Sequence, residues 1–141
     1  MIRMALKWSF FAVLLLAPLW CCAQEEESVD LDRYVEEVNS LCPIDYGDDW
    51  GIGSMTMVGD RYALVDVLLP ANMSMVLSSF SGKSRNVRRL WVRQLEQYGE
   101  RWNRFVELMI EADRRIIISL RPKGSSDTAF VYLSPVDFAN Q

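Results

Sequence analysis

An apolar stripe of helical period runs through residues 84–112 and constrains the fold more than any other feature of the chain. Its members recur at intervals of three and four residues, and they are Val87, Trp91, Leu95, Tyr98, Trp102, Phe105, Met109 and Ala112. This spacing puts all of them on one face of a helix of about eight turns, so we expect that face to pack against a hydrophobic core. Gly99 lies in the middle of the stripe and predicts a kink, or a break into two helices.

Strand-forming residues gather on both sides of this helical region. The predicted strands cover residues 51–58, 62–69, 115–121 and 128–133. A turn that contains glycine separates the members of each consecutive pair, which predicts two β-hairpins. A further apolar pattern of helical period over residues 29–41 predicts an N-terminal helix that Pro43 ends.

These elements together predict one α+β domain over residues 29–138. We expect the two hairpins to join edge to edge as a four-stranded antiparallel sheet, with the N-terminal helix and the long helix packed on one face. Residues 43–50 are expected to form an acidic loop, and residues 71–83 a linker with at most one helical turn.

The first 23 residues have the layout of an export signal. Arg3 and Lys7 supply a positive start, residues 8–20 (WSFFAVLLLAPLW) are apolar, and small residues precede an acidic tract. The apolar run is too short for a membrane-spanning helix. We therefore expect a signal peptide over residues 1–23, an acidic linker over residues 24–28, and a domain that is exported to the periplasm or secreted, with no membrane span after cleavage.

The end of this signal leaves three outcomes open: free secretion, lipid anchoring at Cys22, or a signal that stays uncleaved as an anchor. Cys21-Cys22-Ala23 fits the small-x-small site of an ordinary signal peptidase, which would make Gln24 the first mature residue. In a lipoprotein, Cys22 would instead be the first residue and would carry the lipid on its thiol. Trp20 stands where small residues are usual in lipoproteins, so we favour the free product.

Charge is unevenly distributed along the chain. Residues 24–60 contain eleven acidic residues and Arg33 as their only base, whereas residues 82–123 contain eleven bases and five acids. In one interpretation the two regions neutralise each other within the fold, and in the other the basic region is open to an anionic protein or glycan. Nucleic acid is not an expected partner, because the chain has a net charge of −4 and carries an export signal.

Four arginines at the start of the long helix are the candidate binding residues: Arg85, Arg88, Arg89 and Arg93. Arg85, Arg89 and Arg93 are spaced four residues apart and therefore share one helix face. Guanidinium groups suit carboxylate, phosphate or sulfate groups because their N–H donors form a planar fork. The alternative is a solvated helix face in which Glu96 and Glu100 pair with these arginines.

Residue types that commonly carry catalysis are scarce. The chain has no histidine, the commonest general base and metal ligand. The segment 51–54 (GIGS) has no base to activate its serine, so we interpret its glycines as a bulge or a close contact. Asp45, Asp48 and Asp49 lack the spacing of a calcium-binding loop. We therefore predict no catalytic residue, no metal site and no cofactor.

The expected function is that of a non-enzymatic binding or protein-interaction module of unknown role. A small carboxylate-dependent hydrolase of the cell envelope is the alternative, because the fold rather than the spacing brings carboxylate pairs together. After cleavage Cys42 would be the only cysteine, which leaves no internal disulfide. We expect Cys42 to be a buried small hydrophobe, with an intermolecular bridge or a reactive thiol as the alternative.

The pattern Asn39-x-x-Cys42-Pro43-Ile44, followed by the two hairpins and by Ser134-Pro135, resembles a family of small exported proteins common in Bacteroidota. The resemblance covers about residues 29–135 and is lost in the basic helix over residues 84–104. Members of that family have no assigned activity, so the resemblance implies an exported α+β fold and no mechanism.

We predict that the mature product begins at Gln24 and that this residue is cyclised to pyroglutamate. Intact mass and palmitate labelling of the expressed protein measure this directly. A palmitate-labelled product that begins at Cys22 would contradict the prediction and would identify a lipoprotein.

Overall fold

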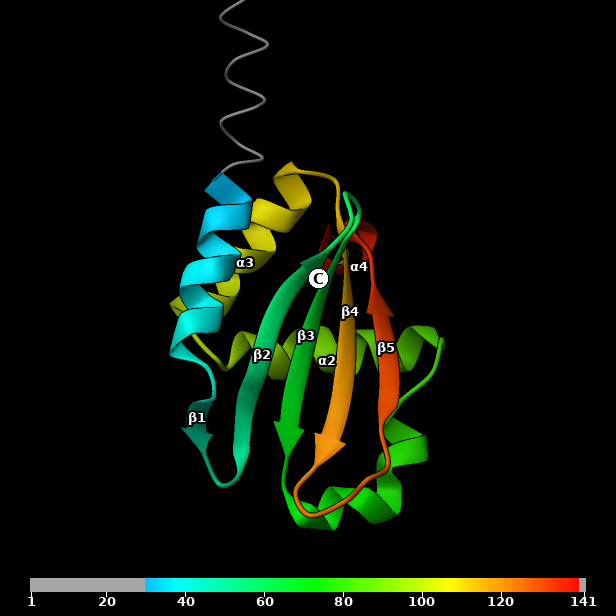
Figure 1. Cartoon of the computed structure of the whole chain (residues 1–141). Coiled ribbons are helices and arrows are strands. Elements are labelled where there is room, and N and C mark those ends of the chain that lie inside the picture. The colour runs from blue at the N-terminus through cyan, green and yellow to red at the C-terminus, as the bar shows by residue number, and fades with distance from the viewer. Residues whose placement is uncertain (1–29, 140–141) are drawn as a thin grey trace, which may run out of the picture. The chain divides into compact units, whose positions relative to one another are not determined.

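In the computed structural model, which describes residues 30–139, five strands form one mixed sheet in the order β1-β2-β3-β4-β5 (Figure 1). The strands are β1 (Ile44–Gly47), β2 (Trp50–Val58), β3 (Tyr62–Leu69), β4 (Arg115–Pro122) and β5 (Ala129–Leu133). Neighbouring strands are antiparallel, except that β3 and β4 are parallel. The protein is therefore an α+β fold, as the sequence predicts.

The prediction of four antiparallel strands is wrong in two respects. First, part of the expected acidic loop over residues 43–50 forms β1, which pairs with β2. Second, the two hairpins join through a parallel pair, because a long helical connection returns the chain to the starting end of β3 before β4 begins. Both faces of β3 carry apolar residues, as is usual for the central strands of parallel sheets.

Helices precede β1, fill the connection between β3 and β4, and follow β5. They are a helix over residues 30–41, the 3₁₀-helix η1 (Ala71–Phe80), α2 (Arg85–Glu96), α3 (Glu100–Glu111) and the short α4 (Pro135–Ala139). Gly99, with φ of 87°, separates α2 from α3, which confirms the predicted break. Residues 71–80 contain more helix than the single turn expected in the linker.

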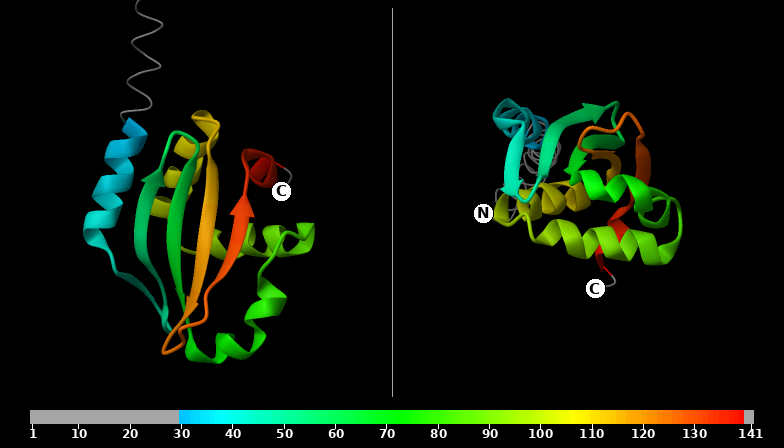
Figure 2. Two further views of the ribbon diagram at one scale, coloured as in Figure 1. Left: turned by 45° about the vertical axis from the view of Figure 1, so that its right-hand side comes forward. Right: turned by 90° about the horizontal axis from the view of Figure 1, so that it is seen from below.

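The hydrophobic core lies between the sheet and these helices. Ala63, Val65, Val67 and Leu69 are the alternate residues of β3 that face it, and all four are fully buried. Trp91, Trp102 and Phe105 are the largest buried side chains, and they come from the apolar stripe that the sequence shows. Figure 2 shows α2 and α3 on one side of the sheet, as the stripe predicts.

The other side of the sheet, which we call the open face, carries no covering helix within residues 30–139 (Figures 1 and 2). Its outer strand β5 directs Phe130 and Tyr132 to this side, where they are 46% and 48% exposed. Leu64 of β3 and Ile117 of β4 lie beside each other in register on the same face and are half-buried. The fold thus leaves one partly aromatic sheet surface accessible.

Gly51 and Gly53 of β2 are close-contact positions. A Cβ atom on Gly51 would lie 2.3 Å from the backbone oxygen of Ile44 in β1. A Cβ atom on Gly53, where a β-bulge interrupts the register with β3, would lie 2.6 Å from Oδ2 of Asp66. The interpretation of these glycines as a bulge and a close contact is therefore confirmed.

We predict that Gly51→Ala destabilises the protein more than Gly53→Ala. The first substitution must displace the backbone of β1 and should lower the free energy of unfolding by about 2–3 kcal/mol. The second displaces only the ends of side chains and should cost about 1 kcal/mol or less. Urea denaturation of the two variants measures the difference, and equal losses would contradict the close β1–β2 contact.

Candidate functional site

Three of the four candidate arginines form an exposed row on α2, which we call the arginine stripe (Arg85, Arg89 and Arg93). The helix positions them because its buried side is taken by Trp91, Val92 and Leu95. Within residues 30–139, no ion pair and no side-chain hydrogen bond includes a guanidinium of the stripe. The binding role of these residues stays a prediction, and their side chains are accessible for it.

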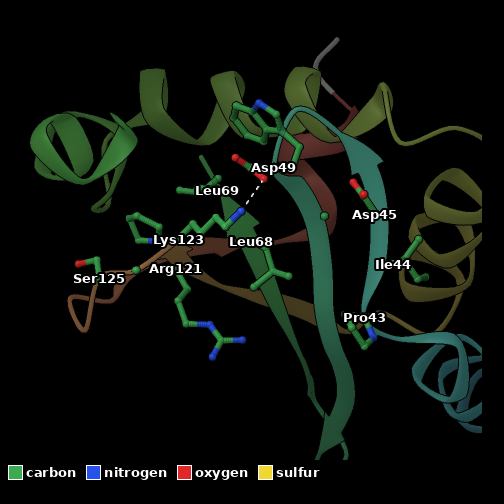
Figure 3. A pocket seen from close by; sticks show the side chains of 13 residues that line it. Pro43, Ile44, Asp45, Asp49, Leu68, Leu69, Arg121, Lys123 and Ser125 are labelled. Atoms are coloured by element: carbon green, nitrogen blue, oxygen red, sulfur yellow. Dashed lines mark hydrogen bonds and ion pairs between the residues drawn. The ribbon is translucent and has the colours of Figure 1, made fainter. Parts of the chain in front are cut away.

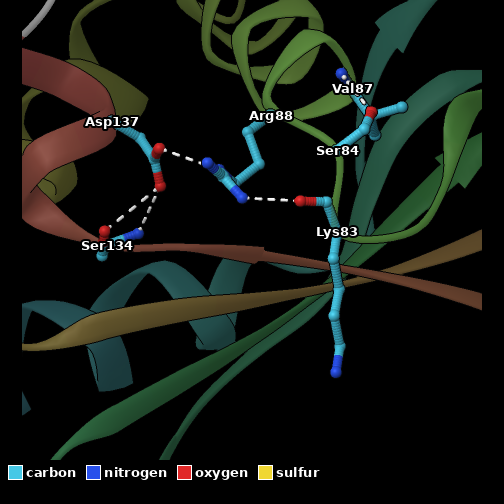
Figure 4. Close-up of polar contacts among 6 residues, drawn as sticks. All are labelled: Lys83, Ser84, Val87, Arg88, Ser134 and Asp137. Atoms are coloured by element: carbon cyan, nitrogen blue, oxygen red, sulfur yellow. Dashed lines mark hydrogen bonds and ion pairs between the residues drawn. The ribbon is translucent and has the colours of Figure 1, made fainter.

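Arg88 is engaged inside the fold (Figure 4). Its Nε lies 3.0 Å from Oδ1 of Asp137 in α4, and its Nη1 donates to the backbone oxygen of Lys83 at 2.6 Å. The other carboxylate oxygen of Asp137 accepts hydrogen bonds from the backbone N–H and the hydroxyl of Ser134. Arg88 therefore attaches α4 to α2, whereas no arginine of the stripe forms an ion pair within residues 30–139.

Two ion pairs join the acidic N-terminal region to the basic C-terminal region. Arg114 Nη1 lies 3.3 Å from Asp32 Oδ1, and Lys123 Nζ lies 3.1 Å from Asp49 Oδ1. Mutual neutralisation, the first interpretation of the charge asymmetry, thus applies to these pairs. Within the described residues it does not extend to the arginine stripe, none of whose members forms an ion pair there. The expected alternative, in which Glu96 and Glu100 pair with these arginines, is not observed in the same range either.

A cavity of about 430 Å³ opens at one end of the sheet (Figure 3). We call it the sheet-end cavity; the β1–β2 hairpin lines one side of it, and the end of β4 with the following loop lines the other. The lining residues used below are Pro43, Ile44, Asp45, Asp49, Trp50, Leu68, Arg121, Pro122 and Lys123. The cavity therefore combines an apolar wall with both signs of charge.

The charged side chains of this cavity have defined partners. Lys123 pairs with Asp49 across the opening, whereas Arg121 points away from them and pairs with Asp66 of β3 (Figure 3). Asp45 accepts a hydrogen bond from the backbone N–H of Gly47 at 2.8 Å. The sequence predicts only an acidic loop at these aspartates, because nothing local indicates that residues more than seventy positions later lie opposite them.

A second hollow, of about 510 Å³, lies between the N-terminal helix and α3. Tyr34, Tyr98, Glu100, Arg101 and Arg104 line it. The Tyr34 hydroxyl donates to the backbone oxygen of Arg101 at 2.8 Å, and Arg104 pairs with Glu107. Tyr98 stacks on Tyr46 with ring centroids 4.2 Å apart, and burial raises the pKa of the Tyr98 hydroxyl. The Tyr34 hydrogen bond thus joins the N-terminal helix to α3, and the tyrosine stack joins β1 to the connection between α2 and α3.

Cys42 is half-buried and packs against the core. Its thiol donates to the backbone oxygen of Val38 at 3.4 Å, and burial raises the pKa of the thiol. A raised pKa disfavours the nucleophilic thiolate. This environment agrees with the interpretation of Cys42 as a small packed side chain.

Within residues 30–139, no three side chains of the Cys, Asp or Glu type come together as a possible metal site. None of the helices in this range is both long enough and apolar enough to cross a membrane. The predicted signal and linker over residues 1–28 lie outside the described residues.

Comparison with known proteins identifies no family. No family model matches the chain, and no curated protein matches it. One solved structure is similar, that of a protein from Pseudomonas aeruginosa that is provisionally described as secreted. It shares 10% sequence identity with a TM-score of 0.46, over 82% of this chain and 95% of that chain.

We predict that Arg88 and Asp137 stabilise the fold as a coupled pair. A double-mutant cycle with Arg88→Met and Asp137→Asn should give a coupling free energy of about 1–2 kcal/mol, because this pair is largely shielded from water. The exposed pair Arg104–Glu107 serves as the control, and its cycle with Arg104→Met and Glu107→Gln should give less than about 0.5 kcal/mol. Equal couplings in urea denaturation would show that Arg88 has no special role in attaching α4.

Proposed function

We propose that the chain is an exported, non-enzymatic binding domain and that the arginine stripe contacts an anionic partner. One observation carries the proposal: Arg85, Arg89 and Arg93 are exposed, share one face of α2, and have no ion pair within residues 30–139. Their neighbour Arg88, by contrast, is held by Asp137. The stripe therefore supplies positive charge that the described fold does not use.

The geometry of the stripe suits a ligand with repeated negative charges. Residues four apart on an α-helix are separated by about 6 Å along its axis, so the stripe spans about 12 Å. Each guanidinium can bind a carboxylate or sulfate group through two parallel N–H donors. An anionic glycan or an acidic protein segment presents such groups in a row, which a single small anion does not.

Support for export comes from the N-terminal sequence. The positive start, the short apolar run and the following acidic tract together have the pattern of a cleaved signal. The resemblance to exported proteins of Bacteroidota points the same way. Export, together with the unpaired positive charge of the arginine stripe on α2, supports a binding role outside the cytoplasm.

The alternative function is a small carboxylate-dependent hydrolase. One observation favours it, because Asp45 and Asp49 both line the sheet-end cavity. Against it, Asp49 is ion-paired with Lys123, and Asp45 accepts a hydrogen bond within its own turn. Carboxylate-pair hydrolysis needs one acid that donates a proton and one carboxylate that acts as base or nucleophile. The contacts of both aspartates favour a structural role.

We predict that Arg85→Gln, Arg89→Gln and Arg93→Gln together weaken binding to heparin, a sulfated glycan, by about tenfold or more. Three exposed charge contacts of about 0.5 kcal/mol each account for this loss. Heparin chromatography and titration calorimetry measure it. The wild-type protein should be released as ionic strength rises from about 0.1 M to 1 M, over which the screening length falls from about 10 Å to 3 Å.

A matched control is the triple variant Arg33→Gln, Arg61→Gln and Arg115→Gln. These arginines are also exposed but lie on other elements, so the change of net charge is the same. The control should bind heparin nearly as the wild type does. Equal weakening by both triple variants, or a loss of several kcal/mol of stability in the stripe variant alone, would contradict a binding role for the stripe.

A further inference from the structure

The sheet-end cavity has the dimensions of a small-ligand site. Its volume of about 430 Å³ falls within the range of about 300–1,000 Å³ that is typical of ligand pockets. Two segments far apart in sequence build it, around Asp45–Trp50 on one side and Arg121–Lys123 on the other (Figure 3). The ion pair Lys123–Asp49 connects the two sides.

Most of the charges that line this cavity are already ion-paired. Arg121 and Lys123 are positive, whereas Asp45 and Asp49 are negative. Lys123 is paired with Asp49 and Arg121 with Asp66, so neither cation is left to neutralise an anion. A cation would meet only the carboxylate of Asp45, which is exposed to water, and exposed charges contribute little to binding. A hydroxyl group both donates and accepts hydrogen bonds, and it can therefore bond to a carboxylate and to a cationic donor at once. The polar lining suits an uncharged ligand that carries several hydroxyl groups.

The ion pairs leave hydrogen-bonding capacity for such a ligand. An ammonium group has three N–H donors and a guanidinium has five, while Lys123 and Arg121 each use one in their ion pairs. The second carboxylate oxygen of Asp45 has no hydrogen-bond partner within residues 30–139. Donors and acceptors thus remain on both sides of the cavity.

The apolar wall supplies the second half of the recognition. Trp50, Pro43 and Pro122 line the cavity with flat, rigid groups. The centroid of the Trp50 ring lies 6.3 Å from the centroid of the Trp91 ring. Trp91 is 1% exposed and belongs to the core. Packing against a buried ring holds the wall in place before a ligand arrives, which reduces the entropy lost on binding. Aromatic surfaces of this kind pack well against the C–H faces of sugar rings.

The open face continues this surface away from the cavity. Arg121 and Leu68 belong to both, and the next pairs along the strands bring Ser119 beside Phe130 and Ile117 beside Tyr132. Phe130 and Tyr132 are two residues apart on one face of β5, which separates them by about 7 Å. Their exposed rings therefore form two further flat surfaces next to hydroxyl and charged groups.

We propose that the sheet-end cavity binds one sugar unit of a neutral glycan and that the glycan continues over the open face onto Phe130 and Tyr132. The site combines ion-paired groups that keep free hydrogen-bonding capacity with aromatic surfaces, and both are needed for an uncharged polyhydroxylated ligand. It lies on the sheet and not on α2. It therefore does not depend on the anionic partner proposed for the arginine stripe.

The test is an NMR titration of the isotope-labelled, processed protein with defined sugars. The neutral probes are glucose, galactose, mannose and N-acetylglucosamine, with cellobiose and chitobiose as disaccharides, each up to about 10 mM because weak sites bind in the millimolar range. Glucuronate and glucosamine are the charged counterparts. At least one neutral sugar should saturate and shift the Trp50 and Lys123 resonances, and it should bind at least as tightly as its charged counterpart.

Variants locate the site. Lys123→Met should weaken the neutral sugar about tenfold, whereas Lys83→Met, at an exposed lysine outside the cavity, should not. Phe130→Ser with Tyr132→Ser should reduce disaccharide affinity to that of the monosaccharide, and Val136→Ser, at a 65% exposed apolar residue of α4, should leave it unchanged. The dispersion of each variant's spectrum checks that it is folded.

Three results would overturn the proposal: saturation by no neutral sugar, tighter binding of a charged counterpart than of the neutral sugars, or equal effects of Lys123→Met and Lys83→Met. Release of new reducing ends from a bound disaccharide supports the site while contradicting the non-enzymatic function. Heparin binding has no bearing on these outcomes. The experiments therefore distinguish a failure of the proposed anion binding by the arginine stripe from a failure of the proposed sugar binding by the sheet-end cavity.

Discussion

The parallel pairing of β3 with β4 is the constraint on which the rest of the structure depends. The two strands are in register from Tyr62–Arg115 to Leu69–Pro122. Parallel strands begin at the same end of a sheet, so the chain must travel back the full length of the strand between them. Residues 70–114 make this return as η1, α2 and α3, whose apolar sides cover the core. Within residues 30–139, no comparable segment is left to cover the open face.

The same arrangement decides which basic residues stay available. The helical period of α2 directs Trp91 and Leu95 to the core and therefore directs Arg89 and Arg93 to solvent. Arg88 lies at the boundary between the two sides, where α4 packs, and it is the arginine that finds a carboxylate partner. The positive charge on the outer side of α2 thus remains exposed as a consequence of core packing, whatever its function.

Features with a strong local pattern are predictable from this sequence, and contacts between distant segments are not. The apolar stripe predicts the buried faces of α2 and α3, and Gly99 predicts the break between them. Strand β1 is missed because it has only four residues, of which just Ile44 and Tyr46 are apolar. Whether β3 and β4 pair in parallel or antiparallel depends on the course of the whole connection over residues 70–114, and no local segment encodes it.

The candidate sites, too, divide into one that a local sequence pattern predicts and one that depends on contacts between distant segments. Exposure of the arginine stripe is a matter of helical periodicity, so the sequence is sufficient to predict it. The contact of Arg88 with Asp137 spans 49 positions, and that of Lys123 with Asp49 spans 74. Side chains this far apart meet only because the sheet order brings them together. A single sequence carries no pattern that reports such a meeting, so the sheet-end cavity emerges only with the fold.

The acidic side of that cavity depends on a turn whose backbone is intrinsically unfavourable. Gly47, Asp48 and Asp49 follow one another with φ angles of 99°, 53° and 68°. A left-handed conformation costs an ordinary residue about 1–2 kcal/mol, and aspartate tolerates it better than most because its side chain bonds locally. The hydrogen bond from Gly47 to Asp45 and the ion pair of Asp49 with Lys123 offset this cost. The two interactions that stabilise the turn are thus also the ones that place both carboxylates at the cavity, so its shape and its charge cannot be changed independently.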